Sequence, residues 1–167
     1  MFPVAARSTG PEQGEAARSR LLLALPTEGA ELATTLDDLY RHGDTAERLA
    51  ILRTLPALDQ AGRIGPEALP LTADALRTND ARLVTAAMGP YAARHLDQSA
   101  WRQGVLKCLF MGIPLDTVAG LSRRTDPELL GMFRAFAVER TAAGRPVPQD
   151  LRTQLDLHPT GEPLAHL

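Results

Sequence analysis

Leucine and alanine recur three or four positions apart through most of this 167-residue chain, with charged residues between them. That spacing places the apolar side chains on one face of an α-helix. No segment alternates apolar and polar residues over the length of a strand between hairpin turns. The pattern therefore predicts an all-α fold, a single domain of about seven to eight helices.

Helix-start and helix-stop residues divide the chain. Asp44-x-x-Glu47 has the spacing of a capping box, and Asp126-Pro127 places a cap before a proline suited to the first helical turn. We expect Gly43 to end one helix in the left-handed conformation, and Pro56 to end the next. The segments expected to be helical are 11–25, 27–43, 44–56, 66–77, 81–88 with a continuation over 91–96, 98–111, a short turn over 116–121, 126–143 and 149–155.

These segments define a helical domain over residues 11–155, with a flexible lead-in over 1–10 and a flexible tail over 156–167. Residues 22–26 and 52–56 resemble each other, since both end in leucine and proline, and they lie 30 positions apart. Helical-hairpin repeats have periods of this size. The similarity of these two segments favours a HEAT-like stack, and an irregular helical bundle is the alternative.

The most apolar helical run is Trp101–Met111, which holds the only tryptophan, lysine and cysteine of the chain. We expect it to be a central helix around which the others pack. Ser99, Gln103 and Lys107 form a thin polar stripe along it at i, i+4 spacing. The stripe either faces water or lines a polar cleft, in which Lys107 offers a cation to a phosphate or carboxylate.

Composition excludes several classes of function. A net charge of −2 gives no footprint for nucleic acid. A single cysteine cannot form an internal disulfide and fits a reducing, cytoplasmic setting. No apolar run is long enough to insert into a membrane. No cluster of histidine, cysteine and acidic residues indicates a metal site, and no motif indicates a cofactor.

Other candidate residues have ordinary structural explanations. Cys108 lies among large apolar residues, which favours a core position over a nucleophile. Either Asn79 or Asp80 is expected to cap the helix that follows. Arg124, near the start of a later helix, either binds an anion there or is an ordinary loop arginine.

One series of short motifs resembles the EboA family over about residues 77–152. In chain order these motifs are Arg77-Thr78-Asn79, Pro90-Tyr91, Ala100-Trp101-x-Gln103-x-Val105-Leu106-Lys107-x-x-Phe110, Pro114-Leu115, Gly120-Leu121, Arg124 and Glu139-Arg140-x-Ala142-Ala143-Gly144-Arg145. The chain departs from the family pattern at Arg102, Ser122, Val138 and Thr141, where the pattern has Asn, Asp, His and Trp. If the family's site used those polar residues, this chain has an altered ligand.

The resemblance implies a bacterial protein of an ebo-type gene cluster, whose neighbours include a prenyltransferase-like membrane enzyme and a sugar-cyclase-like enzyme. Such clusters are associated with the synthesis or export of a small secondary metabolite. The resemblance therefore implies an accessory protein that binds a pathway intermediate or a cluster-encoded enzyme. The residues expected to bind are Gln103, Lys107, Asn79, Tyr91, Arg124 and Trp101.

Two alternatives stay open. The first is a metal-independent enzyme, a cyclase or isomerase acting on a prenylated or cyclitol-like substrate, with Lys107 and Glu139 as candidate catalytic residues. The second is a pure protein-interaction scaffold. The sequence identifies neither the ligand nor the oligomeric state.

Overall fold

The computed structural model describes residues 11–159, and within them it contains ten α-helices, two short 3₁₀ helices and no strand. The predicted all-α fold is therefore confirmed; the helix count exceeds the expected number because the short α6 and α8 are separate helices. Residues 1–10 and 160–167, expected to be flexible, lie outside the described part. The elements are α1 (Pro11–Leu23), α2 (Gly29–His42), α3 (Thr45–Gln60), η1 (Pro66–Ala68), α4 (Leu69–Arg77), α5 (Ala81–Ala87), α6 (Pro90–His95), α7 (Gln98–Met111), η2 (Leu115–Thr117), α8 (Leu121–Arg124), α9 (Pro127–Ala142) and α10 (Gln149–Leu157).

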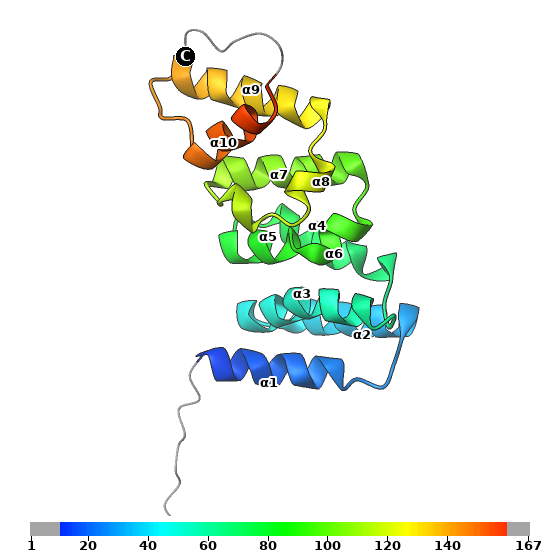
Figure 1. The fold of residues 1–167 in the computed structure, drawn as a ribbon. Coiled ribbons are helices and arrows are strands. Elements are labelled where there is room, and N and C mark those ends of the chain that lie inside the picture. Colours follow the sequence, from blue (N-terminus) through cyan, green and yellow to red (C-terminus); the bar gives the residue numbers. More distant parts are fainter. Residues whose placement is uncertain (1–10, 160–167) are drawn as a thin grey trace, which may run out of the picture.

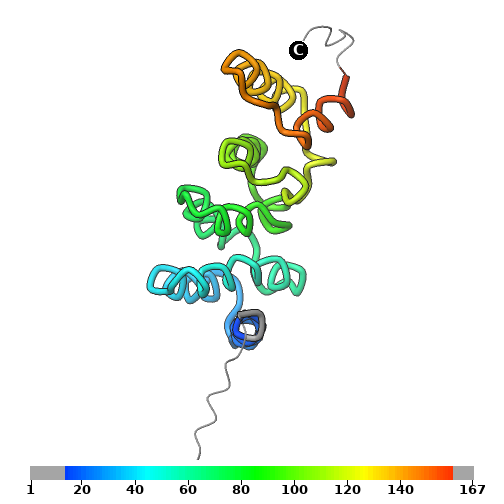
Figure 2. The backbone as a smooth tube through the Cα atoms, turned by 90° about the vertical axis from the view of Figure 1, so that its left-hand side faces the viewer, coloured from blue at the N-terminus to red at the C-terminus, as the bar shows by residue number. Residues whose placement is uncertain are grey.

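The helices form an elongated stack of layers that follows the order of the chain (Figures 1 and 2). The layers run from α1 at one end, through α2–α3, α4–α6 and α7–α8, to α9–α10 at the other. Helices α1 and α2 pack on α3, α3 packs on α5 and α6, and α5 packs on α7, which in turn contacts α9. Each layer thus buries its apolar face mainly against the layers next to it.

Helix α5 joins two hydrophobic cores. Its Leu83 and Ala87 belong to the core built with α1–α4, whereas its Val84 and the following residue Met88 belong to the core built with α7, α9 and α10. The expectation that Trp101–Met111 is the hub of the whole fold is wrong, because a stack has no single hub. That segment, α7, is instead central to the second core, where Trp101 is completely buried.

Local capping signals are reproduced closely. Asp44 and Glu47 form the complete capping box of α3, with each side chain bound to the backbone N–H of the other. Asp97 accepts from the backbone N–H of Ala100 to cap α7. Asp126 accepts from the backbone N–H of Leu129 to cap α9, and Pro127 follows at the first helical position. These signals depend on neighbours within one turn, so the sequence contains them in full.

One predicted helix-end conformation and one predicted helix end are wrong. Helix α2 does end before Gly43, as expected. Gly43 is not left-handed, since its φ is −77°; a Cβ there would lie 2.7 Å from the carbonyl oxygen of Leu39, so close approach explains the glycine. Pro56 lies inside α3, which continues to Gln60. The continuation buries Leu58 completely, and this burial offsets the hydrogen bond that a proline removes from a helix.

The connection after α1 is held by Arg63, which follows α3. Helix α1 ends at Leu23 rather than Leu25. The Arg63 guanidinium donates hydrogen bonds to the backbone oxygens of Leu23, Leu25 and Thr27, at 2.6 Å for Leu23 and 2.9 Å for Thr27. These bonds satisfy carbonyls that lack helical partners and fix the path of the chain from α1 to α2. At the far end, α10 continues two residues past the expected Leu155.

Candidate functional site

An open groove of about 710 Å³ runs along α7 between that helix and α4. Three of the six residues predicted to bind a ligand lie in it, namely Asn79, Gln103 and Lys107. Its volume falls within the range of about 300–1,000 Å³ found for small-molecule sites. Most of the remaining lining is apolar: Ala73, Leu76, Leu96, Ala100, Gly104, Leu106, Phe110 and Met111.

Close packing of α5 behind α7 positions the groove. A Cβ built at Gly104 would lie 2.3 Å from the Met88 sulfur, so a larger residue there would require the Met88 side chain to move. Gln103 and Lys107 follow each other by one turn of α7, and their side chains therefore lie along one side of it. Phe110, three residues beyond Lys107, is 68% exposed. An exposed aromatic ring beside a lysine gives the groove both an apolar surface and a charge.

The charges that line the groove are positive. No acidic residue of the described chain lines it, whereas Arg77 and Lys107 both do. Arg77 pairs with Asp74 at 2.8 Å on the exposed surface, but half-buried Lys107 makes no ion pair with any residue from 11 to 159. The groove is thus complementary to a molecule with an apolar body and an anionic group.

Asn79 is available to the groove because its neighbour does the capping. The side chain of Asp80 accepts from the backbone N–H of Arg82 at 2.9 Å, and it also pairs with that guanidinium. Of the two residues that the sequence allowed as the cap of α5, Asn79 and Asp80, it is therefore Asp80 that caps the helix. The exposed Asn79 lines the groove at the end of α4.

Trp101 and Arg124 do not line this groove, because they form a structural unit of the second core. The guanidinium of Arg124 lies over the Trp101 ring, 4.9 Å from its centroid. It also donates to the backbone oxygens of Ala93 and Leu96, at 3.0 and 2.8 Å, close to the end of α6. An arginine engaged in this way is not free to bind an anion.

Tyr91 does not line the groove either. Its hydroxyl donates to the backbone oxygen of Gly65 at 2.5 Å, and its ring packs against His95. Burial raises the pKa of Tyr91 to about 12. His95 in turn bonds Asp59 of α3 at 2.7 Å, so this cluster ties α6 to α3.

Neither Glu139 nor Cys108 is placed to act as a catalytic partner of Lys107. Glu139 lines a smaller groove of about 280 Å³ with Phe136, Arg140 and Arg145, and Phe110 lines both grooves. Cys108 is completely buried, and desolvation raises the pKa of its thiol to about 11. A thiol in this state is a poor nucleophile.

Two of the four departures from the family pattern have structural partners. Arg102 pairs with Asp126 at 3.1 Å and with Glu128 at 2.6 Å, which ties α7 to the start of α9. Thr141 donates to the backbone oxygen of Ala137 at 2.9 Å. Ser122 and Val138 are exposed. None of the four lines the α7 groove.

Sequence reasoning missed Arg77 and Phe110 as lining residues. Both stand in the motifs that resemble the family, Arg77 two residues before Asn79 and Phe110 three residues after Lys107. A helical wheel of α7 extended to Phe110 would have added the aromatic ring. Arg77 lies on another helix, so only the packing of α4 beside α7 brings it to the groove.

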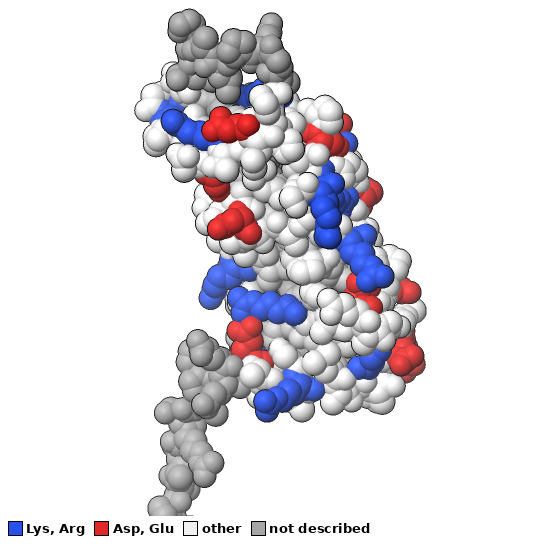
Figure 3. Space-filling model, viewed as in Figure 1, with Lys and Arg blue, Asp and Glu red and all other residues white. Residues whose placement is uncertain are grey.

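On the face shown in Figure 3, basic and acidic side chains are interspersed among uncharged ones, without a large patch of one sign. Within residues 11–159 there is no group of three histidine, cysteine or acidic residues arranged to hold a metal ion. No helix in the same part of the chain combines the length and apolar character needed to cross a membrane.

The fold and this groove define a stacked all-helical protein with an open, cation-bearing groove of small-molecule size. Residues 11–156 match the model of a family described as metabolite traffic protein EboA, and the chain belongs to the EboA family. The family indicates a role in metabolite traffic. No curated protein and no solved structure matches the chain.

Proposed function

We propose that this protein binds a small amphipathic anion of its pathway in the α7 groove and acts there as an accessory carrier, not as a catalyst. The observation that supports this most directly is Lys107, a cation without an acidic partner among the described residues, set in a largely apolar groove of about 710 Å³. An apolar body would cover Leu106 and Phe110. A carboxylate or phosphate would accept from Lys107, with the amides of Gln103 and Asn79 within the same groove.

The arrangement supports binding over the alternative of a metal-independent cyclase or isomerase. Acid–base chemistry needs a second proton-transfer group beside the lysine. Glu139, the expected partner, lines the neighbouring groove instead. Among residues 11–159, no histidine, tyrosine or cysteine lines the α7 groove.

Isothermal titration calorimetry tests the proposal with three ligands that share an octyl chain and differ in their head group: octyl phosphate, octanol and octylammonium. We expect octyl phosphate to bind best. Lys107→Gln should weaken it about fivefold, the effect of one half-exposed ion pair, and Lys107→Arg should retain most of the affinity. Arg123→Gln, which removes an exposed charge outside the groove, is the matched control.

Equal binding of the three heads, or full affinity for octyl phosphate in Lys107→Gln, would contradict the proposal. The scaffold hypothesis also has one supporting observation, the exposure of Phe110 on an open groove. It predicts that Phe110→Ala abolishes capture of a cluster-encoded enzyme while octyl phosphate does not compete with that capture.

A further inference from the structure

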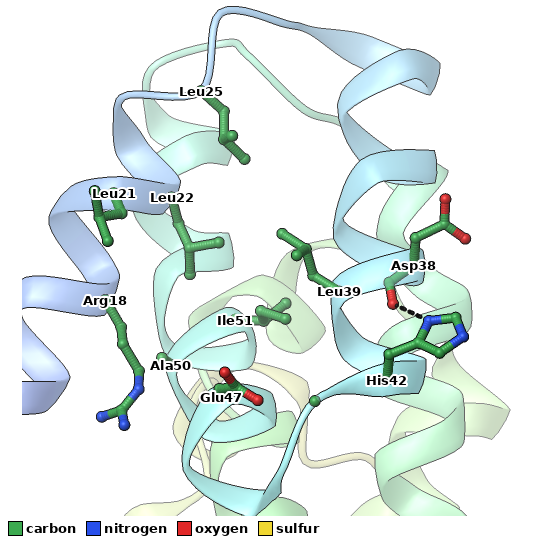
Figure 4. Close-up of a pocket in the computed structure, with 11 residues that line it drawn as sticks. Arg18, Leu21, Leu22, Leu25, Asp38, Leu39, His42, Glu47, Ala50 and Ile51 are labelled. Carbon is green, nitrogen blue, oxygen red and sulfur yellow. Dashed lines mark hydrogen bonds between the residues drawn. The ribbon is translucent and has the colours of Figure 1, made fainter.

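A second cavity, of about 580 Å³, lies between α1, α2 and α3 (Figure 4). It shares no lining residue with the α7 groove. Six of its lining residues are aliphatic: Leu21, Leu22 and Leu25 from α1 and the turn after it, Leu39 from α2, and Ala50 and Ile51 from α3. The sequence alone does not reveal this cavity, because its leucines fit the pattern of core positions.

The cavity exists because α1 and α2 both pack on α3. Ala50 and Ile51 of α3 form a completely buried floor, with exposures of 1% and 2%. The walls come from α1 and α2, and hydrogen bonds from Arg63 to Leu23, at the end of α1, and to Thr27 hold the connection between these helices in place. The shape therefore belongs to the folded backbone, which favours a pre-formed site.

The walls present leucine to solvent. Leu22 of α1 and Leu39 of α2 point toward one another across the cavity (Figure 4). Leu39 is 45% exposed and Leu21 is 71% exposed, although both are large aliphatic side chains. Covering them with an apolar molecule would remove this surface from water, which is favourable roughly in proportion to the area covered.

The charges around the cavity are balanced. Arg18 and the carboxylate of Glu47 lie at the end opposite Leu25 (Figure 4), and one oxygen of Glu47 already accepts from the backbone N–H of Asp44. The carboxylate of Asp38 and the ring of His42 point away from Leu22 (Figure 4). The charges nearest the apolar walls are thus one of each sign. Unlike the α7 groove, this cavity has no net attraction for an anion.

We infer that the α1–α2–α3 cavity binds an uncharged, mainly hydrocarbon molecule, distinct from the anion proposed for the α7 groove. Its chain lies along Leu21, Leu22 and Leu39 over the floor of Ala50 and Ile51. A small neutral polar end lies between Arg18, which donates hydrogen bonds, and Glu47, which accepts them. The two sites together give the protein one neutral and one anionic ligand class.

The neutral dye N-phenyl-1-naphthylamine, whose fluorescence rises in an apolar site, tests this inference on the full chain. Leu39→Gln and Leu21→Gln should each weaken dye binding at least about fivefold, since each replaces aliphatic surface that the dye covers. Leu157→Gln is the matched control, because Leu157 is 65% exposed and lies outside the cavity. It should leave dye binding unchanged. All three leucines are exposed, so the variants should fold, and circular dichroism checks this.

Full dye affinity in both cavity variants, or an equal loss in Leu157→Gln, would overturn the inference. A wild-type dimer that becomes a monomer in Leu39→Gln, measured by light scattering, would also overturn it, because the leucines would then contact a second copy. Octyl phosphate distinguishes this inference from the function proposed for the α7 groove. Its affinity should be unchanged in Leu39→Gln. If the dye does not bind, the octyl phosphate titration still tests the α7 groove.

Discussion

The guanidinium of Arg124 lies over the indole of Trp101, with 4.9 Å between its central carbon and the ring centroid. Arg124 comes from α8 and Trp101 from α7, and the same guanidinium binds backbone oxygens near the end of α6. One side chain therefore joins three helices. The arginine that looked like an anion-binding residue in the sequence instead satisfies unpaired carbonyls and covers the tryptophan.

Arg124→Ala should lower the free energy of unfolding by about 2–3 kcal/mol, because it removes several hydrogen bonds and leaves half-buried carbonyls without donors. The adjacent Arg123 is exposed, so Arg123→Ala should change stability by less than about 0.5 kcal/mol. Urea unfolding followed by the fluorescence of Trp101 measures both. Equal effects of the two substitutions would show that the contacts of Arg124 contribute nothing.

Two glycines inside helices should respond in opposite ways to alanine. A Cβ at Gly104 of α7 would lie 2.3 Å from the Met88 sulfur and 2.9 Å from its methyl carbon. Gly131 of α9 is exposed, and a Cβ there meets no atom within 4 Å. Gly104→Ala should destabilise the protein by about 1–3 kcal/mol through overpacking, whereas Gly131→Ala should stabilise it by about 0.5–1 kcal/mol.

Thermal unfolding of the two variants beside the wild type measures the difference. Because Gly104 also lines the α7 groove, the same substitution should weaken octyl phosphate binding if Met88 moves α5 away from α7. A Gly104→Ala protein as stable as Gly131→Ala would show that the Met88 side chain moves aside at no cost, and would contradict the overpacking.

Sequence signals predicted the N-terminal caps of helices, because the cause of each cap lies within a few residues. Asp97 and Asp126 each cap a helix through a backbone N–H three positions ahead, so their local pattern was sufficient. Pro56 shows the limit, because its local preference predicts a stop. The helix continues since Leu58 is buried against elements that are distant in the chain.

The sequence likewise predicted only the part of the candidate site that depends on a single helix. Helical periodicity placed Gln103 and Lys107 on one side of α7 correctly, and both line the groove. Periodicity could not show that Arg124 would be occupied by α6, because those partners lie about 30 positions back. Nor could it show that Leu39 would be 45% exposed, since α1 and α2 leave a space over α3 only in the folded stack.

The buried thiol of Cys108 should make stability depend on pH in the alkaline range. Desolvation raises its pKa from an ordinary 9.0 to about 11 in the folded protein. The unfolded chain therefore loses this proton first, and the free energy of unfolding should fall as the pH rises from about 9 to about 11. Cys108→Ala removes this contribution, so its stability should fall less steeply over that window than that of the wild type.

The comparison uses the slopes, because Cys108→Ala also changes packing at every pH. An independent measurement is the reaction with Ellman's reagent at pH 8. The native thiol should react far more slowly than the same thiol in concentrated guanidinium chloride, since a neutral, completely buried sulfur offers little thiolate. Rapid reaction of the native protein would place Cys108 at an accessible surface, and parallel alkaline slopes in the two proteins would assign the pH dependence to other groups, such as the buried hydroxyl of Tyr91.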